Sequence, residues 1–269
     1  MTVLPALQAE LAAATNQLLA TAASLSDADV TAPSLLPGWT RGHVLAHLAR
    51  NADSYINLLT WARTRVRTPQ YPSYEARTAG IEAAHRRSAA QLLADVEDGA
   101  ARFAAAVRDL PDHAWSVLVE GMRPPPHPAW YVLVRRLREV GFHHVDLAAG
   151  YGPADWPASF VRRELTDCRR TWPAQRGTIG QIVLRERDAG GGERAEVWPG
   201  LGRGPAVTGT PRDMLAWLTG RSEGQGVSLL PAGQSHVPGP GGVDLPVPPP
   251  WLSMPAPADL PATPPKDYP

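Results

Sequence analysis

Two short segments of the sequence carry side chains that can act together as metal ligands. Glu139 and His143 are four residues apart within residues 130–147, where apolar residues recur at helical spacing. His43 and His47 show the same spacing in an earlier segment. On a helix, side chains four residues apart stand on one face, so a carboxylate and an imidazole can reach the same divalent cation. One pair supplies only two ligands, and the other segment is the best source of a third.

Helices that bind no metal also carry such pairs, as surface ion pairs or as packed polar side chains, and these are more frequent than metal sites. Spacing alone therefore leaves both interpretations open. His144 is a weaker candidate than its neighbour His143, because it points about 100° away around a helix and cannot easily bind the same ion.

The composition gives no reason to expect a nucleic acid or an anionic membrane as the main partner. Of the 269 residues, 26 are basic and 26 are acidic, so the formal net charge is zero. No apolar run approaches the roughly 20 residues that cross a bilayer, and no secretory signal pattern is apparent. Cys168 is the only cysteine, which excludes an intramolecular disulfide and fits a reducing compartment. We expect a cytoplasmic protein that does not associate with membranes.

Four helical segments are predicted in the first part of the chain. They cover residues 3–25, 41–67, 74–110 and 130–147. Thr40 is the expected N-cap of the second helix, and Pro111 ends the third. Helices of this length, joined by short irregular pieces, favour an antiparallel four-helix bundle over residues 1–150. Metal sites in bundles form between facing helices, so the second helix would face the fourth.

A smaller α+β domain is predicted over residues 151–254, so that the fold class is an α-helical domain followed by an α+β domain. Its expected elements are helices 157–170 and 211–218 and strands 179–184, 194–198 and 206–210. Residues 188–192 are expected to form a flexible hairpin turn, and Gly220 is the expected stop of the last helix. Residues 255–269 are rich in proline and are expected to form a disordered tail.

The segments with the candidate ligands carry a family likeness. Residues 36–40, 46–48 and 137–147 resemble segments of the mycothiol-dependent maleylpyruvate isomerases, which belong to the wider DinB-like metalloprotein superfamily. Residues 218–221 and 248–252 are similar to the C-terminal domain of that family. The resemblance covers nearly the whole chain apart from the tail, and it is more specific before residue 150 than after it.

The resemblance implies a DinB-like four-helix bundle that holds a divalent metal, usually zinc, on two histidines and one glutamate. Matched residue by residue, these ligands are His47, Glu139 and His143. The functional arginine of the family's second domain falls on Arg221. A charge that interacts with the C-terminal end of a helix is an equally good interpretation of Arg221.

Three nearby side chains are given supporting roles. His43 is expected to pack beside the ligands rather than bind the metal, because the resemblance selects His47. Asn51 and Asp146 are candidates to orient a ligand or bound solvent. A helix cap or a surface hydrogen bond explains these two residues equally well.

Three protein ligands leave one position of a tetrahedral zinc open, which is typical of catalytic sites. The resemblance implies that mycothiol, a low-molecular-weight thiol, fills this position as a thiolate, so the protein needs no cysteine of its own. The thiolate would add to an activated carbon–carbon double bond, allow rotation, and leave again. Arg221 would hold a carboxylate of the substrate through two parallel hydrogen bonds.

The expected function is therefore that of a zinc- and mycothiol-dependent isomerase, acting on maleylpyruvate or a close unsaturated diacid. A mycothiol S-transferase acting on an electrophile is an alternative that uses the same residues. A non-catalytic metal-binding protein is the alternative from a different class. The expected partner is a small molecule rather than a nucleic acid or a membrane, and the expected assembly is a monomer or a homodimer.

Overall fold

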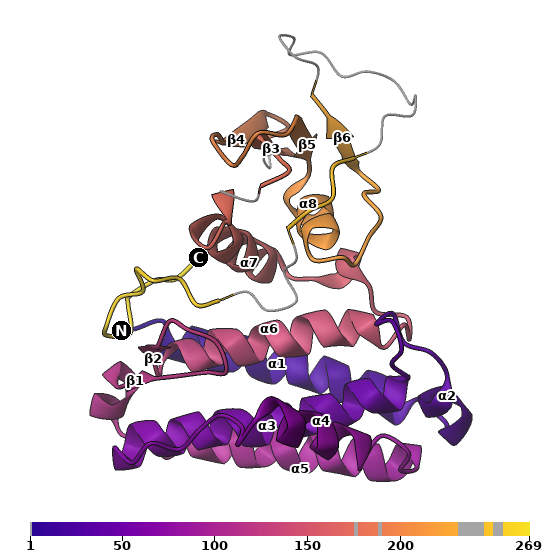
Figure 1. Cartoon of the computed structure of the whole chain (residues 1–269), viewed down its shortest axis with the longest axis vertical. Helices are drawn as coiled ribbons and strands as arrows, with labels where there is room; N and C mark the ends of the chain where they lie inside the picture. The colour runs from indigo at the N-terminus through magenta and orange to yellow at the C-terminus, as the bar shows by residue number, and fades with distance from the viewer. Residues whose placement is uncertain (1, 175–176, 188–189, 231–244, 250–254) are drawn as a thin grey trace. The chain divides into compact units, whose positions relative to one another are not determined.

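A computed structural model describes residues 2–174, 177–187, 190–230, 245–249 and 255–269 of the chain. The chain divides into two compact units (Figure 1). The first consists of Met1–Gly152 together with Pro255–Tyr268, and the second of Pro153–Met254 with Pro269. Two residues of the expected hairpin turn, 188 and 189, lie outside the described part.

The first unit is helical. Its helices are α1 (Leu4–Ala23), α2 (Asp27–Thr31), α3 (Arg41–Thr64), α4 (Tyr74–Glu82), α5 (Ala89–Arg108), the 3-10 turn η1 (Asp112–Ser116) and α6 (Tyr131–Asp146). Two short strands, β1 (Leu118–Val119) and β2 (His127–Pro128), pair antiparallel between η1 and α6. Helices α1 and α3 each pack against both α5 and α6, and their apolar faces form the core.

Helix α3 begins where the sequence predicts. The Thr40 hydroxyl accepts a hydrogen bond from the backbone N–H of His43, and the His43 side chain accepts one from the backbone N–H of Thr40. This reciprocal pair caps donors that a helix start otherwise leaves unsatisfied. The helix ends at Thr64, followed by Arg65 in the left-handed conformation, three residues earlier than predicted.

The prediction of one helix over residues 74–110 is wrong, because the structure has two helices there. Helix α4 ends at Glu82, and α5 begins after Ser88, whose hydroxyl and the Gln91 side chain form a capping box. Such a box is a start signal for a new helix. The helix-favouring composition of the segment outweighed this local signal in the prediction.

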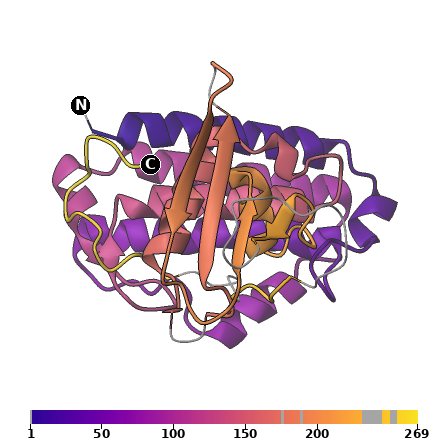
Figure 2. The same ribbon diagram turned by 90° about the horizontal axis from the view of Figure 1, so that it is seen from above.

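The second unit combines a mixed sheet with two helices. Its elements are η2 (Pro153–Asp155), α7 (Ala158–Arg170), β3 (Gln181–Arg187), β4 (Glu193–Trp198), β5 (Ala206–Gly209), α8 (Pro211–Leu218) and β6 (Val227–Leu229). The strand order is β4-β3-β5-β6, in which only the β3–β5 pair is parallel (Figure 2). The coarse prediction of a helical part and a smaller α+β part is confirmed, and β6, only three residues long, was not predicted.

Residues 255–268 differ from the disordered tail that the sequence indicates. The backbone N–H of Val3 donates to Pro265 O at 2.8 Å, and the indole N–H of Trp130 donates to Pro261 O at 2.9 Å. The ring of Tyr268 lies edge-on to Trp130, 5.1 Å between centroids, and is buried. A proline-rich segment without helix or strand is thus held by aromatic packing and by hydrogen bonds to its carbonyl oxygens.

Among the described residues, no helix combines the length and the apolar character needed to cross a membrane.

Candidate metal centre

The structure brings His47, Glu139 and His143 together in the first unit. Nε2 of His47, on α3, lies 3.0 Å from Oε2 of Glu139, and Nε2 of His143 lies 3.3 Å from the same oxygen. The two imidazole rings are nearly perpendicular, with centroids 4.7 Å apart. One ligand atom from each of the three residues lies within 4.8 Å of the other two.

Helix packing places these side chains. His47 is on the second turn of α3, which packs against α6, and its side chain is 3% exposed. Glu139 and His143 are one turn apart on α6, with side chains 24% and 15% exposed. The spacing puts the two α6 residues on one face, and the α3–α6 contact supplies the third.

The three groups differ in protonation. Burial by itself would raise the pKa of Glu139, but the hydrogen bonds from His143 and His47 outweigh burial and hold this pKa well below its ordinary value. Burial lowers the pKa of His47 to about 4, so this imidazole is neutral at pH 7. For His143, burial lowers the pKa, but the hydrogen bonds to Asp146 and Glu139 raise it above its ordinary value. A cation at this position would replace protons held by the triad.

Asp146 orients His143. Nδ1 of His143 lies 2.8 Å from Oδ2 of Asp146, whose side chain is 1% exposed, and this contact turns Nε2 toward Glu139. Carboxylates commonly fix zinc-binding histidines in this way. Asn51, the other candidate for this role, instead accepts a hydrogen bond at 2.6 Å from Nη1 of the buried Arg136.

Sequence reasoning missed two side chains beside the triad. The Tyr55 hydroxyl lies 3.5 Å from Oε1 of Glu139 and donates to it. Nη2 of Arg77, on α4, lies 3.3 Å from Nδ1 of His47, where a zinc-bound histidine usually has an acceptor. Tyr55 is eight residues after His47, so two-turn spacing could have identified it, whereas no local signal marks Arg77.

Comparison with known proteins now decides the family. The model of the mycothiol maleylpyruvate isomerase N-terminal domain matches residues 11–148, slightly more than half of the chain. This chain belongs to that family. Two solved structures are similar to it over 92% of its length and 97% of theirs, each with a TM-score of 0.74. They are a mycothiol-dependent maleylpyruvate isomerase, 29% identical, and a histidine-to-alanine mutant described by the same name, 28% identical. No curated protein sequence matches the chain.

Helices α3 and α6 each carry a further histidine that lies outside the triad. His43 stacks on His85 with a centroid distance of 3.7 Å. His144 stacks on Tyr151, also at 3.7 Å, and its Nε2 lies 2.7 Å from the Thr21 hydroxyl.

Arg221 lies in the second unit, directly after α8. Its backbone N–H donates to Ala216 O at 2.7 Å, and Gly220, with φ of +73°, donates to Trp217 O. These two bonds form a Schellman C-cap, which confirms Gly220 as the helix stop. Nη1 of Arg221 donates to Thr219 O at 2.6 Å, an arrangement that matches the helix-end interpretation of this side chain.

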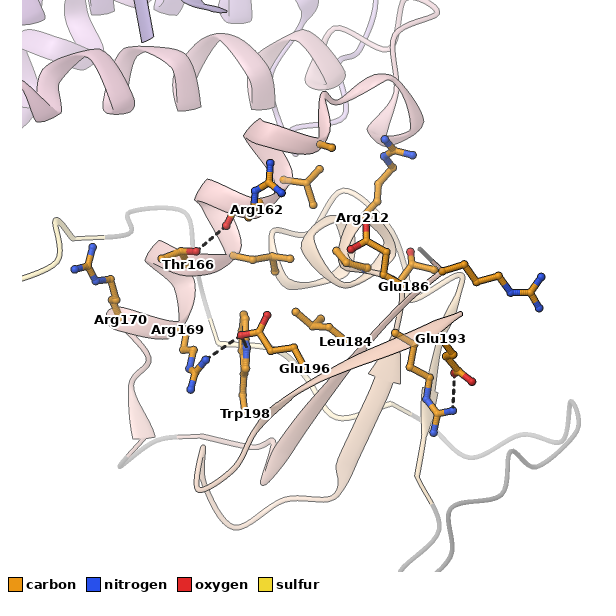
Figure 3. A pocket seen from close by; sticks show the side chains of 17 residues that line it. Arg162, Thr166, Arg169, Arg170, Leu184, Glu186, Glu193, Glu196, Trp198 and Arg212 are labelled. Carbon is orange, nitrogen blue, oxygen red and sulfur yellow. Dashed lines mark hydrogen bonds and ion pairs between the residues drawn. The ribbon is translucent and has the colours of Figure 1, made fainter. Parts of the chain in front are cut away.

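A cavity of about 1030 Å³ lies within the second unit, between α7, the β3–β4 hairpin and the start of α8 (Figure 3). Leu184 and Trp198 line it, together with an Arg169–Glu196 ion pair at 2.9 Å. None of the triad residues lines this cavity.

Proposed function

We propose that this chain is a mycothiol-dependent enzyme that isomerises maleylpyruvate or a close unsaturated diacid at a zinc ion held by His47, Glu139 and His143. The observation that carries the proposal is the convergence of both Nε2 atoms on Oε2 of one carboxylate. Two histidines and one glutamate are a donor set that zinc uses in catalytic sites, with a fourth position open. The similarity to a maleylpyruvate isomerase structure supports the choice of reaction.

The proposal includes the architecture. Helices α1, α3, α5 and α6 would form the DinB-like four-helix bundle over residues 1–150, and residues 151–254 the α+β domain. The proposed setting is the cytoplasm, with the protein acting as a monomer or a homodimer on a small molecule.

The side chains around the site would prepare it. A bound zinc ion would make a coordinated thiol acidic enough to be a thiolate at neutral pH. His47 offers a neutral nitrogen because burial lowers its pKa to about 4. Asp146 holds Nδ1 of His143 and so aims Nε2 at the site. Tyr55 donates to Oε1 of Glu139, so Oε2 is the carboxylate oxygen that faces the two histidines.

The second domain would contribute Arg221 as the group that binds a substrate carboxylate. A guanidinium can form two parallel hydrogen bonds with a carboxylate, which suits a diacid. In this role Nη1 of Arg221 would exchange the Thr219 carbonyl for the substrate.

Metal analysis of purified variants tests the site. His47→Ala, Glu139→Ala and His143→Ala should each remove the ion or weaken its binding sharply, because two remaining ligands hold zinc poorly. Full zinc occupancy in all three variants would rule the site out. Arg221→Ala should retain the metal and lose turnover, and unchanged turnover would refute its role.

A mycothiol S-transferase is the second candidate, since it would use the same residues. Conversion of maleylpyruvate to fumarylpyruvate with only a catalytic amount of mycothiol would support the isomerase. Consumption of one mycothiol per molecule of electrophile supports the transferase. Metal binding without any thiol-dependent turnover favours the non-catalytic binding protein.

A further inference from the structure

A second group of metal-ligating side chains lies in the first unit, apart from the triad. His43 is on the first turn of α3, Glu82 is the last residue of α4, and His85 is in the turn that follows. One ligand atom from each lies within 4.8 Å of the other two. We propose that His43, Glu82 and His85 form a second binding site for a divalent transition-metal ion such as Zn²⁺.

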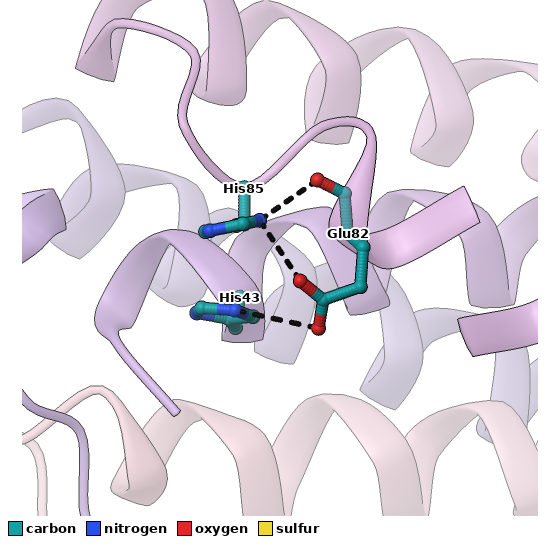
Figure 4. A group of neighbouring side chains, drawn as sticks. All are labelled: His43, Glu82 and His85. Atoms are coloured by element: carbon teal, nitrogen blue, oxygen red, sulfur yellow. Dashed lines mark hydrogen bonds and ion pairs between the residues drawn. The ribbon is translucent and has the colours of Figure 1, made fainter. Parts of the chain in front are cut away.

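The carboxylate already faces both imidazoles (Figure 4). Oε1 of Glu82 lies 3.7 Å from Nε2 of His43, and Oε2 lies 3.6 Å from Nδ1 of His85. Ligand atoms around a tetrahedral zinc, each about 2.0–2.2 Å from the ion, are about 3.3 Å from one another. Each of the two distances exceeds this spacing by only a few tenths of an ångström, and the Glu82 side chain, which is 55% exposed, has room to turn one oxygen toward the ion.

The geometry shows which nitrogen of each histidine would bind the ion. Nε2 of His43 faces Glu82, while Nδ1 accepts a hydrogen bond from the Thr40 backbone N–H at 3.1 Å. Binding an ion through Nε2 would move the ring proton to Nδ1, which would then donate to the Thr40 hydroxyl, 2.8 Å away. In His85, Nδ1 is the nitrogen that faces the Glu82 carboxylate, and it also lies 2.9 Å from the backbone oxygen of Glu82. Nδ1 would therefore be the ligand atom of His85 and would exchange the carbonyl contact for the ion, while Nε2 keeps the bond it accepts from the exposed Arg86 at 3.3 Å.

Metal binding requires one rearrangement. The rings of His43 and His85 are stacked at 20° and 3.7 Å, and parallel lone pairs cannot both point at one ion. His85 would tilt out of the stack and give up its contact with the Glu82 carbonyl, because it lies in a turn, whereas Thr40 holds His43 at the start of α3.

Gly42 allows the turn that carries His85 to lie close to helix α3. A Cβ added there would lie 2.3 Å from the backbone oxygen of His85, a distance at which the chain would have to move. Only glycine lets the turn after α4 rest directly on α3 at this point. The proximity of the two histidines is thus built into the packing of the unit and does not depend on flexible surface side chains.

The second ion would connect α3 to the end of α4, whereas the triad connects α3 to α6. Because α4 carries Arg77, which contacts His47 at 3.3 Å, an ion at Glu82 would also hold in place the helix that reaches the first site.

Counting ions in the whole protein tests the proposal. Metal-free full-length protein is titrated with Zn²⁺ by calorimetry, and bound zinc is measured after desalting. The wild type should bind two ions per chain, Glu82→Gln/His85→Asn one, and His47→Ala/His143→Ala one. The variant with all four substitutions should bind none. Glu97→Gln/His113→Asn, which replaces exposed residues of the same types, should bind two.

An ion count in Glu82→Gln/His85→Asn that equals the count in the wild type would overturn the proposal. The melting temperature gives a second readout, because an ion that binds only the folded state raises it. Zn²⁺ should raise the melting temperature of His47→Ala/His143→Ala but not that of the four-residue variant, and equal shifts in both would also overturn the second site. Retention of both ions by His47→Ala/His143→Ala would instead count against the proposed function alone.

Discussion

At the scale of single residues, the candidate metal centre depends on groups that aim the ligands as much as on the ligands. Asp146 is buried beside His143 and fixes its ring, whereas Arg77 presents a cation to His47. The meeting of His47, Glu139 and His143 could be predicted from the sequence, because helical spacing marks the pair on α6 and the family likeness selects His47. Arg77 could not, because it lies on another helix and its approach depends on how α4 packs.

The role of Asp146 leads to a prediction at this scale. Asp146→Asn should keep the shape of the side chain but lose the charge that holds the Nδ1 proton of His143. We expect zinc affinity to fall about 10- to 100-fold, as for other outer partners of zinc-bound histidines. A competition titration with a chelator measures this, and exposed Asp112→Asn is the control. Equal affinities in the two variants would contradict the role of Asp146.

At the scale of elements, the start of α3 was predictable and the break before α5 was not predicted. Both starts carry a side-chain cap, but the Ser88 cap is set within a stretch of strong helix formers. A long-range contact helps to end α4, because the turn at His85 lies against Gly42 of α3. A pattern read along one segment contains no information about that contact.

Gly42 allows a test of this packing. Gly42→Ala would place Cβ against two backbone oxygens, those of His85 at 2.3 Å and Val30 at 3.1 Å. We expect a loss of about 1–3 kcal/mol in the free energy of unfolding, the usual cost of overpacking. Gly80→Ala, whose Cβ would meet only the Arg50 side chain at 3.8 Å, should gain up to about 1 kcal/mol from helix propensity. Urea unfolding of both variants gives the comparison, and a neutral Gly42→Ala would contradict the close approach.

The buried His127 on strand β2 should make the stability of the protein depend on pH. Burial lowers the pKa of His127 to about 3, whereas an unfolded histidine titrates near 6.5. Between these values the unfolded chain binds the additional proton, so stability falls as the pH falls through this range. His127→Phe should reduce the loss between pH 6.5 and 5 by about 1.5 kcal/mol. Denaturant unfolding at both pH values measures it; exposed His113→Asn should leave the loss unchanged, and the same loss in His127→Phe would refute the assignment.

At the scale of the whole molecule, the two-part division and the helical character of the first part followed from the change in composition near residue 150. The path of residues 255–268 could not be predicted from composition. A proline-rich composition argues against regular structure, but it does not indicate whether the segment packs on the rest of the unit. The segment is held by contacts with Trp130, which is more than 100 residues away in sequence from Pro261 and Tyr268.

This docking can be measured through Tyr268. Tyr268→Ala should lower the free energy of unfolding by about 3 kcal/mol, since it removes a buried aromatic ring that packs on Trp130 and Tyr131. It should also change the Trp130 fluorescence. The neighbouring exposed Asp267→Ala should do neither, and an unchanged unfolding midpoint in Tyr268→Ala would show that the segment contributes nothing to stability.

Residues 255–268 complete the first unit although residues 153–254 of the second unit precede them along the chain. During synthesis, the indole of Trp130 therefore cannot contact Pro261 and Tyr268 until the inserted unit has been translated. A nascent chain halted before residue 255 should expose this apolar patch on an otherwise formed set of helices, and such a chain is where binding by a chaperone is to be expected.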